Sequence, residues 1–423
     1  METWIPEIRI FHGCEPDPRL SHLAACAGGD GAWTMAALMH LGMLRLLAVI
    51  SGSATVASLA YCLLSLWAAT RFLGRSLDRA PSGDWPSLSV LKPLKGADRE
   101  LYESLRSHCL QDYPQYEILF GITETNDPAA HVVTKLIEEF PECKLKLVTC
   151  NKRLGANGKV STLAQLAPLA SHEILLINDS DIRVTPDYLR TIASELQPTQ
   201  TGMVTCLYRG LAARTLASRL EALTISTDFV PGVLAASLIE GGLHFGLGST
   251  LAFRRRQLQA IGGLEAIVDY LADDYELGRR ISRQGLKVEL SSAVVETHIP
   301  AYDLAQFVSH QLRWARTIRT SRPGGYAGLV LTFTLPWAVA ALIFARGAAW
   351  AWFLFSAALS VRVCVAIASC RFVLEDRKTF DSLWLLPLRD FVAVLVWMGG
   401  LVGNTVVWRG KKFSLKGGKL RPL

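Results

Sequence analysis

The sequence has 423 residues, of which half are hydrophobic and only 19% are charged, and its formal net charge is +7. A soluble domain carries about a quarter charged residues, so this composition excludes a disordered chain, a small disulfide scaffold and an enzyme without membrane contact. The basic residues are spread along the chain, which argues against a nucleic-acid partner. The nine cysteines form no CxxC pair, so they indicate reduced thiols, not a disulfide framework or a zinc site.

The first apolar stretch, residues 44–69, contains one charged residue, Arg45, and is long enough to span a bilayer. It is followed by arginines, which by the positive-inside rule place the next part of the chain in the cytoplasm (Arg71, Arg75 and Arg79). A cleaved signal peptide is the alternative, but the stretch is too long and lacks a clear cleavage site. Residues 1–43 show no periodicity, and we expect a disordered tail or a start codon assigned too early.

Residues 71–326 are soluble in composition, and short β-rich runs alternate there with helical patterns. We expect strands at 88–92, 117–123, 146–149, 174–178 and 203–207, and helices at 100–109, 129–139, 159–167 and 186–195. This alternation predicts an α/β domain with a mostly parallel sheet. Ligands on such sheets bind at the carboxyl ends of the strands, so a site is expected at that edge.

Apolar stretches also follow the soluble part, at residues 329–345, 348–368 and 383–408, and they predict two or three membrane segments within 329–408. Charges inside a membrane are costly, so those in the stretches are expected to pair or to lie at the membrane surface (Arg362, Arg389 and Asp390). One span before the domain and three after it would put the basic tail, residues 409–423, on the side opposite the domain. Either the third stretch lies along the interface or the charge rule fails here.

The sharpest chemical signal is a pair of aspartates, Asp179 and Asp181, directly after the apolar strand at 174–177. Two carboxylates at a strand end face an open crevice and suit Mg²⁺ or Mn²⁺, whose remaining positions are filled by water and substrate phosphates. The pattern therefore predicts the metal–diphosphate clamp of a nucleotide-sugar enzyme. The alternative is a solvated turn or a helix cap.

A second acidic pair, Asp273 and Asp274, stands at the start of a helical run. An acceptor hydroxyl is a poor nucleophile until a carboxylate takes its proton, and we assign this general-base role to Asp274. The alternative is that both acids only complement the helix dipole.

A basic and aromatic cluster, His310, Arg313 and Trp314, lies on a helix just before the C-terminal apolar stretches. These side chains could hold a departing diphosphate and pack against a nucleotide. The alternative is a juxtamembrane anchor.

The loops after the first strands supply further candidate nucleotide contacts. Lys95 and Asp98 follow the first strand, Glu124 ends the second, and Lys159 follows a glycine-containing loop that could bring amides and an ammonium to a phosphate. For Asp98 the alternative is an ordinary helix N-cap.

Taken in order, these elements resemble glycosyltransferase family 21, which includes the ceramide glucosyltransferases and the bacterial hopanoid-biosynthesis glycosyltransferases. The resemblance runs from residue 44 to the C-terminus and rests on KPLKGAD at 92–98, QDYPQYE at 111–117, DSDIRV at 179–184, LADDYELG at 271–278, HQLRWARTIR at 310–319 and VVWRG at 406–410. Asp98 and Asp179 stand at the family's first two signature aspartates, Asp181 completes the metal motif, and Asp274 stands at the catalytic base. His310 departs from the pattern, because related enzymes carry Gln or Arg there.

The resemblance implies a GT-A catalytic domain, Rossmann-like with a mostly parallel sheet, on the cytosolic face of a membrane. It implies an inverting hexosyltransferase that takes UDP-glucose or UDP-N-acetylglucosamine and a lipid acceptor, most simply in a bacterial inner membrane. The run VTCLYRG at 204–210 favours a hopanoid polyol as acceptor, with ceramide as the alternative. A processive polysaccharide synthase and a non-catalytic scaffold are the rival functions. No acceptor-binding residue is assigned, although residues 229–243 could form an interfacial lip for the lipid or pack in the core.

Overall fold

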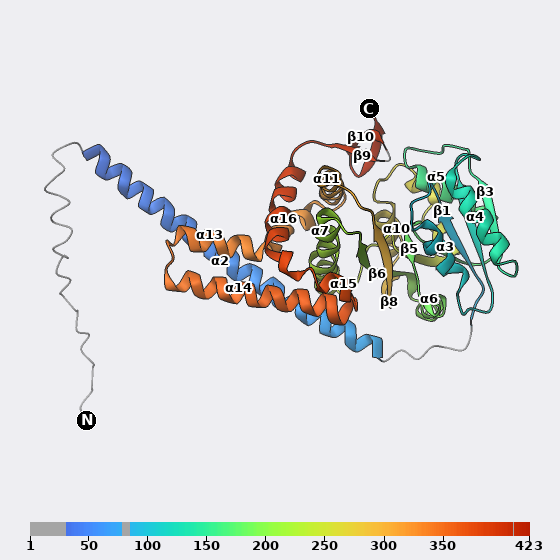
Figure 1. Ribbon diagram of the computed structural model, residues 1–423, viewed down its shortest axis with the longest axis horizontal. Coiled ribbons are helices and arrows are strands. Elements are labelled where there is room, and N and C mark those ends of the chain that lie inside the picture. Colours follow the sequence, from blue (N-terminus) through green and yellow to red (C-terminus); the bar gives the residue numbers. More distant parts are fainter. Residues whose placement is uncertain (1–30, 78–84, 409) are drawn as a thin grey trace, which may run out of the picture.

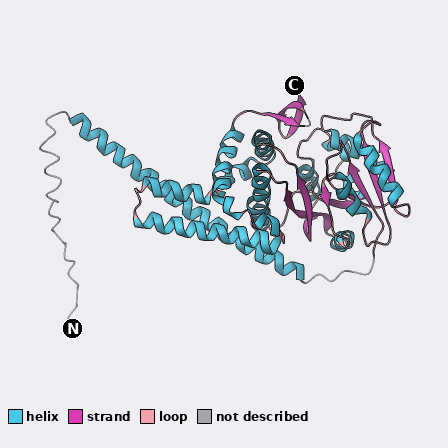
Figure 2. Cartoon of the chain, viewed as in Figure 1, coloured by secondary structure: helices cyan, strands magenta, loops and turns pink. Residues whose placement is uncertain are grey.

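The computed structural model describes residues 31–77, 85–408 and 410–423, with side chains described from residue 38. Its α/β domain lies at one end, and helices project from that domain (Figure 1). The strands gather in this domain and in a small sheet at the C-terminus, while the projecting part is entirely helical (Figure 2).

The strands of the domain form one eight-stranded sheet. Their bounds are Leu88–Pro93 (β1), Tyr116–Ile122 (β2), Lys144–Thr149 (β3), Ile174–Ile177 (β4), Ile182–Arg183 (β5), Thr201–Ala212 (β6), Leu251–Arg254 (β7) and Lys287–Ile299 (β8). The order is β3-β2-β1-β4-β7-β6-β8-β5, and β7 runs antiparallel between β4 and β6, whereas β1 to β4 and the pair β6–β8 are parallel. The predicted strands are all present, and the mostly parallel α/β class is confirmed.

Helices cover both faces of this sheet and bury two cores of apolar side chains. They are Leu101–Cys109 (α3), Pro128–Glu139 (α4), Gly158–Leu166 (α5), Tyr188–Leu196 (α6), Arg255–Ala260 (α9) and Asp273–Ser282 (α10). Their starts follow local capping chemistry: the Asp127 side chain accepts from the N–H of Ala129 with proline at the first turn, and the Asn157 side chain accepts from Val160. These caps open α4 and α5 at the edge of the sheet where the strands end.

A continuous helical segment crosses the sheet and was not anticipated from the sequence. It comprises α7 (Leu216–Thr224), a π-helical turn η2 (Ile225–Phe229) and α8 (Val230–Ile239). The segment is apolar enough for a membrane span, yet more than half of its most apolar window is buried. In α8 the side chains of Val230, Val233 and Leu234 lie in the core, whereas Ile239 is exposed, so residues 229–243 are buried only in part.

The N-terminal membrane helix is longer than the sequence suggested. α2 runs from Gly31 to Leu77, and its candidate span covers Leu38–Gly74. Residues 31–43, expected as part of a tail, are therefore helical, and the rest of that expected tail, residues 1–30, lies outside the described residues. α2 is almost uniformly apolar and places Leu46, Val49 and Val56 at its surface, as a lipid-facing helix does.

The C-terminal helices divide into two groups. After the helix α11 (Leu304–Ser321), α13 (Thr334–Phe344) and α14 (Ala349–Ile367) form a hairpin that contacts α2 and lies along it (Figure 1). α13 is joined to the short helix before it (α12, Pro323–Gly328, with the turn η4, Leu329–Thr332) at a bend of 56°. By contrast, α16 (Leu386–Leu401) runs across that direction, against α11 and α7 (Figure 1).

The described part of the chain contains four helices long and apolar enough to cross a membrane, or five if the bent pair is one span. α16, with the residues just before it, is one of the four. It is polar inside and apolar outside, because Arg389 and Asp390 are buried whereas Trp384, Leu395 and Met398 are exposed. An exposed apolar face of this kind fits a helix against lipid.

The third apolar stretch does not continue to residue 408, and the basic tail is not a free extension. The stretch ends at Leu401, and the chain then forms a three-stranded antiparallel sheet of β9 (Thr405–Trp408), β10 (Lys411–Lys416) and β11 (Lys419–Pro422). This sheet docks on the α/β domain, where the Leu420 amide donates to the Asp269 carbonyl (2.7 Å) and the Leu271 amide to Gly418 (3.1 Å). The C-terminus therefore lies on the same side of the membrane helices as the domain.

This placement requires an even number of membrane crossings between the domain and its tail. α14 is a candidate span by itself and α13 is one only together with the bent segment before it, so this hairpin would supply two crossings, while α16 lies across its direction, as in the interfacial alternative raised by the sequence.

Buried charges join the membrane helices to the domain. Arg362 of α14 contacts Asp390 of α16 (2.9 and 3.0 Å) and Asp228 of η2 (3.0 Å). Arg389 of α16 bonds Asp390 (3.0 Å) and also Asp228. The charges of two arginines and two aspartates thus balance one another. Charged side chains are tolerated inside a protein only when they are paired in this way. The expectation that these charges pair is met, with Asp228 as an unforeseen partner.

Breaking this four-residue network is expected to destabilise the whole molecule. Arg362→Met leaves two aspartates to share Arg389, with one negative charge uncompensated, and such a loss typically costs about 3–5 kcal/mol. The measurement is the thermal unfolding midpoint of the full chain in detergent. Arg106→Gln, which breaks the partly exposed pair with Glu139, is the control and should leave the midpoint nearly unchanged, because water screens such surface pairs. Equal thermal unfolding midpoints for the two variants would contradict the prediction that the network contributes strongly to the stability of the protein.

Candidate active site

The site lies at the carboxyl edge of the sheet, where β4 ends, as the sequence predicted. Lys159, in the first turn of α5, bridges two carboxylates there: its Nζ lies 2.7 Å from Asp179 Oδ1 and 3.0 Å from Asp273 Oδ2. The ammonium is 9% exposed, whereas the Asp179 side chain is 40% exposed. The nearby aspartates raise the pKa of Lys159 despite its burial, so the lysine stays charged.

Asp274 is held by main-chain amides at the start of α10. Its Oδ2 accepts from the Gly248 N–H and its Oδ1 from the Tyr275 N–H, both at 2.8 Å. Burial, together with the charge of Asp273, raises the pKa of Asp274 to about 6, while Lys159 opposes that rise. A carboxyl with a pKa close to the working pH is suited to accept a proton.

The loop before β7 passes close to these carboxylates because it contains a glycine, Gly248. A Cβ at Gly248 would lie 2.9 Å from Asp179 Oδ2 and 3.3 Å from Asp274 Oδ2. At Gly278 of α10, a Cβ would meet the Gly246 amide nitrogen at 2.2 Å. The missing side chains thus bring Asp179 and Asp274, far apart in the sequence, to opposite sides of one small space.

The donor set around Asp179 and Asp181 was tested for a divalent cation. The described residues contain no group of three or more His, Cys, Asp or Glu side chains arranged to hold a metal. Burial and the charge of Asp179 raise the pKa of Asp181, whose Oδ2 accepts from Thr297 (2.6 Å). A cation would relieve this repulsion, and Mg²⁺ commonly binds one or two carboxylates plus substrate phosphates, so the two aspartates fit such an ion.

Two buried polar side chains, Lys92 and Asn178, form hydrogen bonds next to Asp179. Lys92 at the end of β1 donates to the Asp179 carbonyl (3.0 Å), and burial lowers the pKa of Lys92 to about 7. Asn178 next to it donates to the Ser249 carbonyl (2.7 Å) and the Tyr188 hydroxyl (3.0 Å). The sequence offered Lys92 in the same motif as Lys95, but its burial could not be read from the motif.

The other predicted nucleotide contacts stand at the same edge but are exposed. Lys95, Asp98 and Glu124 lie in the loops after β1 and β2, and no hydrogen bond or ion pair joins their side chains to the aspartates. Asp98 is not the N-cap of α3, which begins after Glu100 without a side-chain cap. The loops are tied by Asp127, whose Oδ1 accepts from the Gly96 amide (2.9 Å); the Asp-Pro pair was the available signal for it.

The predicted cluster on α11 is organised around a residue that the sequence analysis missed. His310 Nδ1 lies 3.0 Å from the carboxylate of Glu221, on α7. The Trp314 ring lies 5.1 Å from the His310 ring and 6.4 Å from Phe229, which in turn lies 5.1 Å from Tyr208, all in tilted arrangements. These ring contacts connect α11 to the α/β domain.

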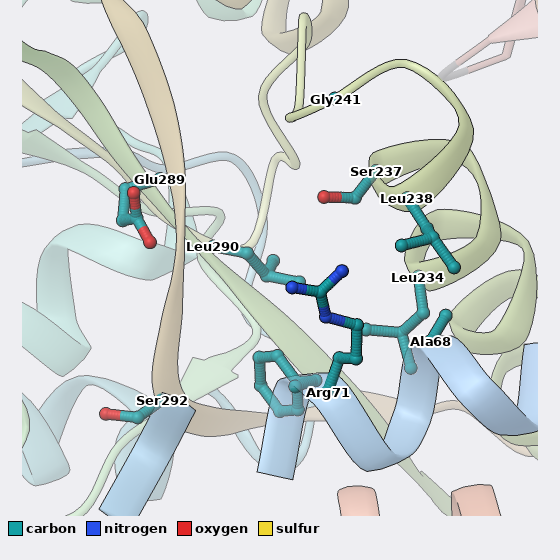
Figure 3. Close-up of a pocket in the computed structure, with 10 residues that line it drawn as sticks. Ala68, Arg71, Leu234, Ser237, Leu238, Gly241, Glu289, Leu290 and Ser292 are labelled. Carbon is teal, nitrogen blue, oxygen red and sulfur yellow. The ribbon is translucent and has the colours of Figure 1, made fainter. Parts of the chain in front are cut away.

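Two cavities lie near but outside this edge. A cavity of about 160 Å³ forms where α2 meets the domain, and Arg71 reaches there between Leu234 of α8 and Leu290 of β8 (Figure 3). An open cavity of about 780 Å³ separates the C-terminal sheet from the loop at Arg153–Ala156. Its lining is basic (Arg153, Lys411, Lys412, Lys419 and Arg421). Neither cavity contains a predicted site residue.

The order and geometry of these elements agree with one known family. The sequence pattern of glycosyl transferase family 21 matches residues 51–420. The chain belongs to glycosyl transferase family 21. It is therefore a hexosyltransferase, and the family predicted from the motifs is confirmed.

Relatives in the family include enzymes of glycolipid synthesis. Ceramide glucosyltransferases 1 and 3 of Caenorhabditis elegans are 23% and 24% identical over 353 and 349 residues, about four fifths of this chain and 74% of each relative. Beta-monoglucosyldiacylglycerol synthase of Trichormus variabilis is 27% identical over 132 residues, 31% of this chain and 28% of that protein. The mannosyltransferase PcManGT of Pyrobaculum calidifontis, solved with GDP-Man and Mn²⁺, shares the fold: TM-score 0.53, 21% identity, 84% of this chain and 97% of that one.

A methyl group at Gly248 should abolish function while leaving the fold intact. In Gly248→Ala the new Cβ intrudes on Asp179 and Asp274, so we expect hexose transfer to fall at least about 10²-fold, the loss expected for a misplaced catalytic group. The measurement is turnover together with the thermal midpoint. Gly328→Ala, where a Cβ would meet nothing within 4 Å, is the control and should retain both. An active Gly248→Ala enzyme would place the reaction elsewhere.

Proposed function

We propose that this enzyme moves one hexose, glucose or N-acetylglucosamine, from a UDP-sugar to the hydroxyl of a membrane lipid with inversion at the anomeric carbon. The observation that carries the proposal is the arrangement of Lys159 between Asp179 and Asp273, with Asp274 beside them, in a domain packed on membrane helices. This arrangement, with an ammonium and several carboxylates at one sheet edge, supports the proposal.

The donor diphosphate is expected beside Asp179. The bridging Lys159 carries a positive charge that attracts phosphate oxygens, and Asp179 with Asp181 would hold Mg²⁺ or Mn²⁺, which when bound neutralises charge on the leaving UDP. Lys95, Asp98 and Glu124 line the loops at the same edge and are proposed to contact the nucleotide. Arg313, with His310 and Trp314 from α11, is proposed to stabilise the departing diphosphate.

Asp274 is proposed as the general base. Its carboxylate is fixed by the Gly248 and Tyr275 amides, so it faces the donor side of the site with little freedom. It would take the proton of the lipid hydroxyl as that oxygen attacks the anomeric carbon, while the bond to UDP breaks on the opposite face. Fixing the base in this way lowers the entropic cost of attack.

The proposed acceptor is a lipid alcohol, because a substrate in the bilayer can reach a domain that sits directly on α2, α11 and α16. Of the two candidate lipids, the hopanoid polyol is supported by the sequence run at 204–210, and ceramide by the names of the C. elegans relatives. The domain and its tail are proposed to face the cytoplasm, in a bacterial inner membrane, since Arg71 and the basic C-terminal sheet share one side.

A product assay tests the donor, the acceptor and the base together. The full chain in detergent is given UDP-glucose or UDP-N-acetylglucosamine with Mg²⁺, and either bacteriohopanetetrol or ceramide, and the lipid products are read by mass spectrometry. One glycosylated lipid is expected, and Asp274→Asn should lower its formation about 10²–10⁴-fold. A chelator should also suppress it. Polymer chains as product would replace this proposal with a polysaccharide synthase, and no UDP binding would favour a scaffold.

The pH dependence should report Asp274. A base must be deprotonated, so with a pKa of about 6 the rate should fall about tenfold for each pH unit below 6 and level off above it. In Asp273→Asn, a neighbour whose negative charge raises that pKa is removed, so the acid limb should move to lower pH. The measurement is kcat/KM between pH 4.5 and 8. An acid limb that stays in place, or moves upward, would contradict the assignment.

A further inference from the structure

Glu221 is a buried carboxylate that the reaction scheme above does not use. It lies on α7 at 4% exposure, and one of its oxygens, Oε2, gathers three donors. These are His310 Nδ1 at 3.0 Å, Gln311 Nε2 at 3.4 Å and the Tyr302 hydroxyl. A buried charge is costly unless it is bonded in this way, so the position of all three donors is set by Glu221.

The contact fixes His310 in orientation. A carboxylate only accepts hydrogen bonds, so the Nδ1–H of the imidazole is the donor. The ring is also flanked by Trp314, with centroids 5.1 Å apart, and by Tyr302 at 6.1 Å. No described residue hydrogen-bonds Nε2, and the side chain is 27% exposed, so Nε2 is the nitrogen left for a ligand.

The pair lies close to the acidic site. β6, the strand that carries Tyr208, borders that site: the Leu247 amide donates to Thr205 of β6 (2.9 Å), and the next amide, Gly248, donates to Asp274 (2.8 Å). The phenol of Tyr208 packs on Phe229, which packs on Trp314 and so reaches His310. A series of ring contacts therefore leads from His310 to Tyr208, on the strand that borders Asp274.

We propose that Glu221 is a positioning residue for the transfer step. By holding Nδ1 it presents His310 Nε2 to the diphosphate of the bound donor, and it does so from α7, an element that the motif on α11 does not include. The inference rests on the proposed function, because it takes a nucleotide diphosphate as the group that Nε2 meets. It extends that function in one respect. Related enzymes carry Gln or Arg at position 310, and the histidine found here would act in an orientation that Glu221 fixes.

A double-mutant cycle on the full-length enzyme tests this role. The variants are Glu221→Gln, His310→Asn and the double; the asparagine amide can still donate to Glu221 while Nε2 is lost. Each single variant is expected to lower kcat about tenfold or more, with the KM for the UDP-sugar changed less than about threefold. The double variant should be no worse than His310→Asn alone, because Glu221 would act only through His310. Losses that multiply would show an independent, structural role and would overturn the proposal.

Two control variants separate positioning from general damage to a buried site. Tyr302→Phe removes another donor from the same carboxylate but leaves His310 bound, so kcat should change less than about threefold. Glu195→Gln neutralises a different buried glutamate, which accepts from Ser292 far from α11, and should leave kcat unchanged. If Glu221→Gln does not give monodisperse protein, Glu221→Asp takes its place in the cycle. A loss in Tyr302→Phe as large as in Glu221→Gln would contradict the proposal.

Measuring two products separates a failure of this inference from a failure of the proposed lipid acceptor. UDP release is measured beside lipid product, so the cycle can be completed on UDP release even when neither lipid is glycosylated. Release without lipid product, with a non-additive cycle, would overturn the lipid acceptor and support Glu221. Lipid product with an additive cycle would support the acceptor and overturn Glu221. An enzyme that neither binds UDP nor releases it from a UDP-sugar would overturn both.

Discussion

The molecule depends on one cluster of buried charge, formed by Arg362, Arg389, Asp228 and Asp390. The aspartate contributed by the domain sits in a π-helical turn, and such turns add one residue to a helix and re-aim its side chains. Asp228 consequently points into the membrane part while its neighbour Phe229 packs on Tyr208 beside the site. The π-helical turn thus connects the membrane helices to the residues packed beside the candidate site.

The candidate site also contains buried charged side chains that are balanced by opposite charges or by hydrogen-bond donors. Lys159 is balanced by Asp179 and Asp273, and Glu221 is balanced by a cluster of donors that includes His310. In each case a charge is kept from water by groups that come from different parts of the chain. Such networks are rigid when complete and weak when one member is missing, which would suit the proposed reaction, in which a base is held at a fixed distance from a leaving group.

The sequence was a good guide where local chemistry decides the structure. The predicted strands and helices around Asp179 depend on short-range periodicity and capping, so they appear within a few residues of their expected positions. The partners of Lys159 and Glu221 were not predicted, because tertiary packing brings them together from distant elements. In the C-terminal tail the signal was present: Phe413 and Leu415 alternate with polar residues before a Gly-Gly turn, a hairpin pattern hidden by the expectation of a basic tail.

The docking of β11 has a consequence for how the enzyme is made. Asp269 accepts hydrogen bonds from two sides. One comes from the Ala156 amide, in the loop that leads into Lys159, and the other from the Leu420 amide of β11. Chains fold from their N-terminal parts during synthesis. The α/β domain is therefore translated well before β11, and the loop beside Lys159 obtains this support only after α13, α14 and α16 have been synthesised. The final shape of this loop thus depends on the C-terminal helices being in place.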